Sequence, residues 1–237
     1  MKIHPFLFIA LSAAVGLTRT SAAVVITNGD FETVGSDIQD VSGWLDFTYG
    51  SDNGGSSTGK GDLQQGDSNG SIPSAPSGSN WLNIVDNNSF GVTTGVYQQI
   101  GTYEAGVTSY DVSFIMGLRD DAAFNEIELS LFKGTSGTAA DGTTPIDAGL
   151  TIVGSSHTIS FTGGPAPATA SDSKNFLTTG LSDGDTLWLV LASTDNATGS
   201  TQQGLIDNIS IAAIPEASSL ILLGLGLVGL VAFRRRR

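Results

Sequence analysis

The chain of 237 residues contains no cysteine. Disulfide bonds, thiol catalysis and Cys-ligated zinc are therefore excluded, and the fold must be held together by core burial. Histidine is nearly as scarce: His157 is the only one beyond His4, so a multi-histidine metal site is excluded as well. His-Glu-x-x-His and Walker-type motifs are also missing. These absences predict a protein that is not an enzyme.

Basic side chains are rare outside the two ends of the chain. Residues 24–213 contain 22 acidic residues against four basic ones, which gives a net charge of −18 there, compared with −13 for the whole chain. Such a surface repels nucleic acid and anionic lipid headgroups, so we expect no nucleic-acid partner. Eighteen of the acids are Asp, a residue typical of turns and of calcium sites. We expect turns for most of them and calcium for a few.

The N-terminal residues have the pattern of a secretory signal peptide. Lys2 precedes an apolar stretch from Pro5 to Leu17, and small residues follow at Ser21, Ala22 and Ala23. An uncleaved membrane anchor is the alternative, but this apolar stretch is too short to span a bilayer. We therefore predict a signal peptide over residues 1–23.

A second apolar run lies near the C-terminus. Residues 217–233 carry no charge and are followed by Arg234, Arg235, Arg236 and Arg237. At roughly 1.5 Å per residue a helix of this length nearly spans the hydrocarbon layer, and the arginines place its far end in the cytoplasm. A buried helix of a soluble domain is the alternative, and four consecutive charges disfavour it. We predict a single transmembrane helix over residues 217–233.

The residues that lead into this run carry a resemblance. Pro215, Glu216 and Ala217, the apolar run and the terminal arginines resemble the PEP-CTERM sorting tail of Gram-negative bacteria over residues 214–237, although Ala217 stands where the family usually has a second proline. The resemblance implies processing by an exosortase-type membrane protease. It also implies transient anchoring in the inner membrane, and then delivery to the cell surface or to an exopolysaccharide-containing extracellular matrix.

Helical periodicity is missing from residues 24–213, and alternation of apolar and polar residues replaces it. Tyr110–Leu118 and Glu126–Phe132 show it best, with Leu187–Ala192 apolar on both faces. The other predicted strands are Val24–Asn28, Trp81–Val85, Val96–Ile100, His157–Phe161 and Leu205–Ile211. Many short strands joined by Gly, Ser and Asp turns predict one all-β domain, an antiparallel β-sandwich over residues 24–213.

Three segments are too polar to contribute a core. The longest, Gly50–Ser79, is rich in glycine and serine, and Gly134–Gly149 and Thr162–Asn175 are shorter examples. Loops of this kind are either disordered or bind a ligand, and their composition favours disorder.

Short motifs at both ends of the domain carry a second resemblance. Asn28–Glu32, Gly43–Trp44 and Leu205–Ile211 are similar to the opening and closing segments of galactose-binding-like jelly rolls. In such jelly rolls a structural calcium often joins the first and last strands. The resemblance implies Glu32 and Asp207 as side-chain ligands, with Asp30 as a third.

Alternation also bears on Asp207. It places Asp207 on one face with Leu205, Ile209 and Ile211, among core side chains, where a carboxylate needs a partner. Calcium would require further oxygens from the backbone. The alternative is that Asp207 accepts backbone N–H groups at a strand end.

Neutral glycans are bound by aromatic faces together with Asp, Asn and Gln side chains. Trp44 and Trp81 are the candidate ligand contacts. The acid pairs Asp120–Asp121 and Glu126–Glu128 are interpreted as surface acids rather than as the two opposed carboxylates of a glycosidase.

The sequence therefore predicts an exported, surface-sorted, non-catalytic protein that contacts extracellular polysaccharide. A purely structural or adhesive matrix protein and an extracellular hydrolase are the alternatives.

Overall fold

The structure is a computed structural model that describes residues 24–35, 41–49, 62–65, 71–86, 93–121, 123–124, 126–135, 144–161, 165–193 and 202–216. The predicted signal peptide, the apolar run 217–233, Ala217 and Arg234–Arg237 lie outside these residues. Within the described ranges no helix is long and apolar enough to cross a membrane.

All regular elements in the described part of the chain are β-strands, in agreement with the predicted fold class. They are β1 (Leu45–Tyr49), β2 (Asp62–Gln65), β3 (Asn80–Asp86), β4 (Thr93–Thr102), β5 (Val107–Leu118), β6 (Ala123–Phe124), β7 (Ile127–Lys133), β8 (Thr151–Ile152), β9 (His157–Ile159), β10 (Ala168–Leu177), β11 (Thr186–Ser193) and β12 (Gln202–Pro215).

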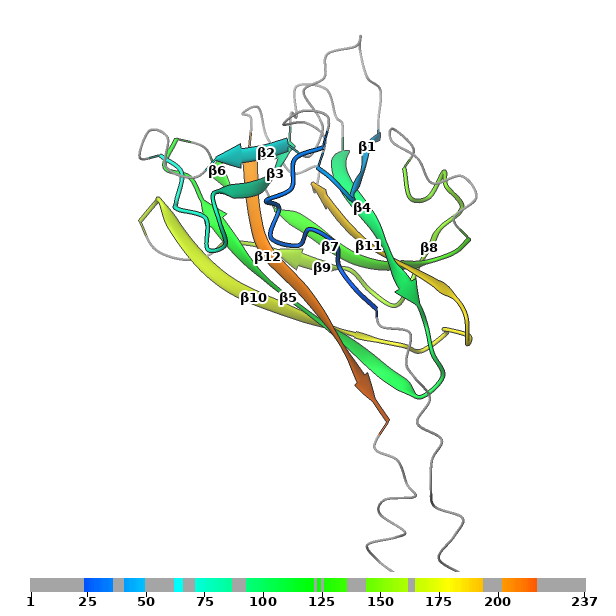
Figure 1. The fold of residues 1–237 in the computed structure, drawn as a ribbon. Coiled ribbons are helices and arrows are strands. Elements are labelled where there is room, and N and C mark those ends of the chain that lie inside the picture. The colour runs from blue at the N-terminus through cyan, green and yellow to red at the C-terminus, as the bar shows by residue number, and fades with distance from the viewer. Residues whose placement is uncertain are drawn as a thin grey trace, which may run out of the picture.

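The strands form two sheets that face each other as a sandwich (Figure 1). Sheet 1 has the order β1-β4-β11-β7-β8, with β9 also paired to β7. Sheet 2 has the order β10-β5-β12-β3-β2, with β6 paired to β12. Every pairing is antiparallel except that of β6 with β12. The antiparallel sandwich is thus confirmed.

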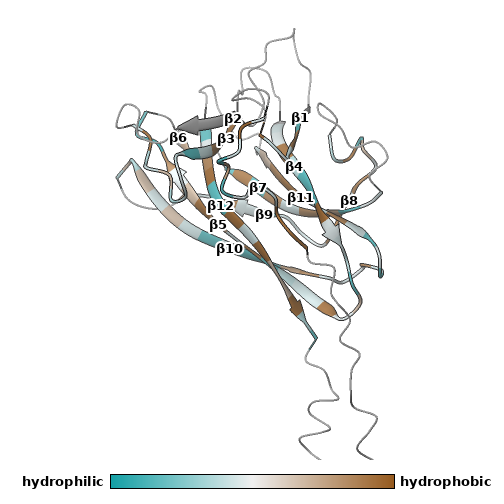
Figure 2. Ribbon diagram, in the orientation of Figure 1, coloured by the Kyte–Doolittle hydropathy of each residue, from teal (hydrophilic) through white to brown (hydrophobic). Residues whose placement is uncertain are grey.

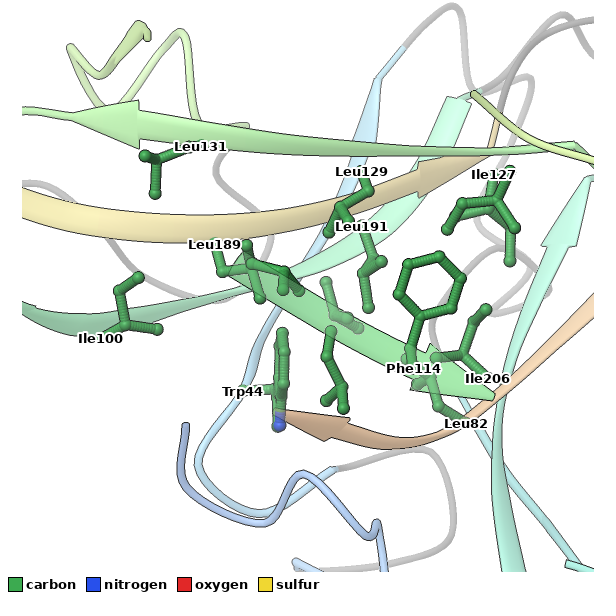
Figure 3. Close-up of a cluster of buried hydrophobic side chains, with 14 of the residues drawn as sticks. Trp44, Leu82, Ile100, Phe114, Ile127, Leu129, Leu131, Leu189, Leu191 and Ile206 are labelled. Atoms are coloured by element: carbon green, nitrogen blue, oxygen red, sulfur yellow. The ribbon is translucent and has the colours of Figure 1, made fainter. Parts of the chain in front are cut away.

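The core between the sheets follows from alternation along the strands, which Figure 2 shows as alternating hydropathy. In β5, Tyr110, Val112, Phe114 and Met116 are buried, whereas Asp111 and Ser113 are exposed. Facing them across the core are buried side chains of β7 and β11, among them Leu129, Leu131, Leu189 and Leu191 (Figure 3). Burial of this apolar layer is the main source of stability in a chain without disulfides.

The other face of β11 is also apolar, as predicted. Trp188 and Val190 pack on the outer face of sheet 1 with Phe47, Tyr97 and Phe132. A turn over residues 144–150 covers this face with Ala148 and Leu150. Sheet 1 is therefore buried on both sides, so its aromatic residues stabilise the fold.

Two segments that we expected to be loops contain strands. β10 begins inside Thr162–Asn175, and β2 lies inside Gly50–Ser79. β10 escaped prediction because it is an edge strand whose side chains are mostly polar and partly exposed on both faces. Conversely, the predicted strand Val24–Asn28 does not form: residues 24–26 are irregular and residues 27–28 lie in a turn, although Val25 N–H still donates to Ile100 O at 2.8 Å.

Candidate functional site

The closing strand β12 contains a bulge that changes which side chains face the core. Asn208 has a positive φ of 52°, which asparagine tolerates better than most residues, and the register with β5 shifts between Asp207 and Ser210. Ile206 and Ile209 lie in the main core, whereas Leu205 packs with Trp81 and Ile72 on the outer face of sheet 2. Uninterrupted alternation over Leu205–Ile211 was therefore wrong, and Asp207 shares the face of Leu205 rather than that of Ile209.

Asp207 is nevertheless fully buried, because the segment 71–79 lies over it. Ser77 N–H donates to Asp207 Oδ2 at 2.8 Å, and Asn208 N–H donates to Oδ1 at 2.6 Å. Acceptance of backbone N–H groups, the alternative to calcium, is thus what the structure shows for this carboxylate. The segment 71–79 belongs to the long polar stretch that we expected to be disordered.

Glu32 is held by the same segment. Its Oε1 accepts N–H groups from Ser79 at 2.8 Å and Asn80 at 2.7 Å. Gly78, at φ 65°, lies so close that an added Cβ would stand 2.1 Å from the Glu32 Cδ. The backbone of residues 77–80 therefore contacts the carboxylates of both Glu32 and Asp207.

The opening Asn-Gly-Asp-Phe-Glu motif places Glu32 at this point. The Asn28 side chain bonds Thr33 N–H and O at 2.9 Å and also Ser42 O at 3.0 Å, which closes the loop on itself. Phe31 is fully buried in the main core, and Gly29 O accepts Ile209 N–H at 2.8 Å. The first and last segments of the domain therefore meet, as the motif resemblance implied.

We call Asp30, Glu32 and Asp207 the acidic junction. Burial raises the pKa of Asp207 to about 6, the two N–H groups oppose this shift, and the charges of Glu32 and Asp30 add to it. Among the described residues no group of three His, Cys, Asp or Glu side chains is arranged to hold a metal ion. A cation here would need main-chain oxygens in addition to the Glu32 and Asp207 carboxylates.

The two tryptophans predicted to contact a ligand are both buried. Trp44 is 4% exposed and packs on Phe31 with ring centroids 5.7 Å apart, and Trp81 is 0% exposed. The Trp81 ring lies over Gly117, and its Nε1 donates to Pro73 O at 2.8 Å. Neither indole offers a face to a sugar, so the assignment of Trp44 and Trp81 as ligand contacts is corrected to packing.

A polar cluster that the sequence did not reveal lies close to Trp81 along β3. Asn83 is 3% exposed, its Nδ2 donates to Gln203 Oε1 at 3.3 Å, and its Oδ1 is buried with no hydrogen-bond partner. Arg119 Nη1 donates to the same Gln203 oxygen at 2.6 Å. Arg119 also forms a bidentate pair with Asp121, at 2.7 Å for each bond. We call Asn83, Gln203, Arg119 and Asp121 the amide cluster.

The amide cluster was missed because its members come from three separate strands or strand ends. Asn83 is in β3, Gln203 is in β12 and Arg119 follows β5. The signal in the sequence was Asn83, a polar residue between the apolar Leu82 and Ile84. Strand alternation explains such a residue equally well as a side chain that faces solvent.

His157 contributes to structure. Its Nε2 lies 2.8 Å from Asp172 Oδ2, so the pair links β9 of sheet 1 with β10 of sheet 2. Glu126 and Glu128, interpreted above as surface acids, both accept hydrogen bonds: Glu126 Oε1 from Ser160 at 2.9 Å and Glu128 Oε1 from Ser130 at 3.3 Å.

The Pro-Glu part of the predicted sorting motif belongs to the folded domain. β12 continues to Pro215, beyond the predicted boundary at residue 213, and Pro215 pairs with Val107 of β5. Glu216 N–H then donates to Gly106 O at 2.6 Å. Strand pairing therefore reaches the motif itself.

Comparison with known proteins bears on the tail and on the fold separately. Residues 213–237 match the family model of the PEP-CTERM protein-sorting motif. No curated protein is significantly similar to the chain in sequence.

Among solved structures, a cyclase from Fischerella sp. TAU in complex with 4-(1H-indol-3-yl)butan-2-one is 16% identical, with a TM-score of 0.58, and the match covers 84% of this chain and 100% of that one. The apo form of a cyclase from Fischerella sp. gives 17% identity, a TM-score of 0.56 and coverage of 84% and 100%. The CBM22-1 xylan-binding domain from Paenibacillus barcinonensis Xyn10C is 12% identical, with a TM-score of 0.45, and the match covers 83% of this chain and 98% of that one.

The likeness to the cyclases concerns the fold alone. The tail match is of a different kind, because it covers the residues that the motif resemblance singled out. Residues 213–237 thus form a PEP-CTERM protein-sorting motif, the signal of an exported and surface-sorted protein, and it continues directly from the last strand of a β-sandwich.

Proposed function

We propose that this protein is an exported, non-catalytic β-sandwich that is sorted to the cell surface, where it contacts neutral polysaccharide. The sorting half of the proposal is supported by the PEP-CTERM motif at residues 213–237. The glycan-contacting half is supported by one observation, the amide cluster with its unpartnered buried acceptor, Asn83 Oδ1.

The amide cluster has the chemistry of a site for sugar hydroxyls. A hydroxyl both donates and accepts, so it is matched by a neighbouring acceptor and donor. Asn83 Oδ1 supplies an unfilled acceptor, and Gln203 Nε2 donates to none of the described residues. A buried polar atom without a partner costs free energy, and a ligand hydroxyl would recover it once the cluster opens to admit the ligand, because Asn83 is only 3% exposed.

Charge favours a neutral glycan over an acidic one. Asp121 pairs with Arg119, so the guanidinium is already neutralised and offers no strong site for a carboxylate or phosphate. The domain as a whole carries a large negative charge, which repels anionic polymers.

The proposal includes no catalytic step. Glycoside hydrolysis requires an acid and a base or nucleophile on opposite sides of one bond. Glu126 and Glu128 instead accept hydrogen bonds from Ser160 and Ser130, and Asp121 is paired with Arg119. Sorting to the cell surface is also consistent with a protein that binds polysaccharide rather than cleaves it.

A structural calcium at the acidic junction is the second part of the proposal. Glu32 and Asp30 both raise the pKa of Asp207, so negative charges are gathered around a buried carboxylate. A divalent cation would relieve this repulsion and would tie the opening loop to β12.

A polysaccharide array probed with the full-length protein in detergent tests the glycan contact. We expect binding to neutral glycans, at least tenfold weaker for Gln203→Ala and unchanged for Gln99→Ala, an exposed glutamine of β4. If the protein bound none of the glycans, the purely structural or adhesive function would remain. Turnover of a bound glycan would instead show a hydrolase.

A further inference from the structure

The sorting motif does not begin in a free linker. Its first residues, Ala213, Ile214 and Pro215, are strand residues paired with Tyr110, Ser109 and Val107 of β5. Thr108 Oγ1 donates to Ile214 O at 3.0 Å, and Glu216 N–H donates to Gly106 O at 2.6 Å. The hydrogen bonds therefore continue up to the residue before Ala217.

The β4–β5 hairpin that receives these residues is itself braced. Gly106, at φ 101°, forms its turn, and Thr178 Oγ1 donates to Val107 O at 2.8 Å. Ala105 N–H donates to the Asp183 carboxylate at 2.8 Å. The turn around residues 178–185 thus holds the hairpin in place, so the motif is bound to a fixed partner.

Beyond Ile209, whose N–H donates to Gly29 O, β12 pairs with β5 alone among the described residues. β3 pairs with β12 over Gln202–Ile206, and beyond the bulge the partner strand in the described part of sheet 2 is β5. In Figure 1 the end of β12 and the β4–β5 turn lie together at one end of the sandwich. Detachment of residues 213–216 would therefore break hydrogen bonds to the β4–β5 hairpin and none to β3.

We propose that the β4–β5 hairpin is a docking surface for residues 213–216, and that it must release them before a membrane protease can bind the sorting motif. The proposal rests on the sorting part of the proposed function. An extended peptide is recognised through main-chain hydrogen bonds along its backbone edge, and β5 already occupies one edge of this segment. The apolar run starts at Ala217, so the sequence provides no free residue between the docked strand and the predicted span.

The docking itself is tested without any protease. Hydrogen exchange on the full-length protein in detergent should show protection of the Glu216 amide. Thr108→Val removes the bond to Ile214 O and should reduce that protection by about fivefold, the effect of one typical hydrogen bond. Thr169→Val, at an exposed position of β10, is the matched control and should leave it unchanged. An unprotected Glu216 amide in the wild type would overturn the docking.

The effect on processing is tested by locking the strand. Ser109 and Ile214 are direct cross-strand partners and the chain has no other cysteine, so Ser109→Cys with Ile214→Cys gives a single reversible disulfide. In membranes of the producing cell, the oxidised form should be processed at least tenfold more slowly than the reduced form. Equal rates would overturn the gating role. Failure of the wild type to be processed would instead contradict the sorting function and leave the exchange result standing.

Discussion

Burial removes the Asp207 carboxylate from water, and the N–H groups of Ser77 and Asn208 replace part of the lost hydration. Its pKa rises to about 6 from an ordinary 3.8. For an acid whose pKa is higher in the folded state, the stabilising contribution is complete below pH 3.8 and is lost as the pH rises to about 6. Ionised Asp207 therefore costs the fold about 3 kcal/mol at neutral pH.

This cost predicts a specific pH dependence in the absence of divalent cations. Asp207→Asn cannot ionise, so the unfolding free energy of the wild type relative to this variant should rise by about 1 kcal/mol between pH 7 and pH 5. Denaturant unfolding at both values measures the difference. A difference that stays constant over this range would show that Asp207 does not titrate there.

Glu32 tests the calcium part of the proposal separately from hydrogen bonding. Glu32→Gln retains an oxygen for the Ser79 and Asn80 N–H groups but removes the charge. We expect a chelator to lower the melting temperature of the wild type and to affect the variant less, with Glu128→Gln of β7 behaving like the wild type. A wild-type melting temperature that the chelator leaves unchanged would show that calcium does not stabilise the fold.

At the scale of elements, the contact between the opening loop and the β12 bulge joins the two ends of the domain. An added Cβ at Gly29 would stand 2.2 Å from Ile209 O, so the backbones meet with no room for a side chain. We predict that Gly29→Ala lowers the unfolding free energy by about 2 kcal/mol or more through this overlap.

Gly180→Ala is the comparison for this change. It adds a Cβ with no neighbour within 4 Å at φ 89°, so it reports backbone strain alone and should cost less. Thermal melts of both variants provide the test, and a Gly29→Ala protein as stable as the wild type would show that this contact does not form.

Strands with alternating apolar side chains were predictable, and elements that depart from alternation were not. β5, β7 and β11 carry large apolar residues at every second position, so burial on one face follows from the sequence. β10 places small and polar residues on both faces, because an edge strand has less to bury. The bulge at Asn208 changes which side chains of β12 face the core, and the pattern of apolar residues does not predict a bulge.

The candidate sites were predictable to different degrees. The motif resemblance correctly indicated that Glu32 and Asp207 lie at one junction, but their N–H donors come from a segment with a disordered composition. Aromatic content suggested Trp44 and Trp81 as ligand contacts, although large indoles are more often buried, as they are here. The amide cluster depends on pairing between distant strands and could not be read from the chain.

At the scale of the whole molecule, β12 carries residues of both the amide cluster and the sorting motif. Gln203 lies near its start and Pro215 at its end, and at roughly 3.3 Å per residue these positions are separated by about 35–40 Å. The amide cluster is therefore at the opposite end of the sandwich from the sorting motif (Figure 1). A domain anchored through its motif would present this cluster away from the membrane.

The most direct test of the account is co-sedimentation of the purified full-length protein with the neutral polysaccharide of the cell that produces it. We expect the wild type and Gln99→Ala to sediment with the polymer and Gln203→Ala to stay mainly in solution. Wild-type protein that stays in solution at every polymer concentration, while its melting temperature shows that it is folded, would contradict the claim that this surface-sorted sandwich contacts glycan.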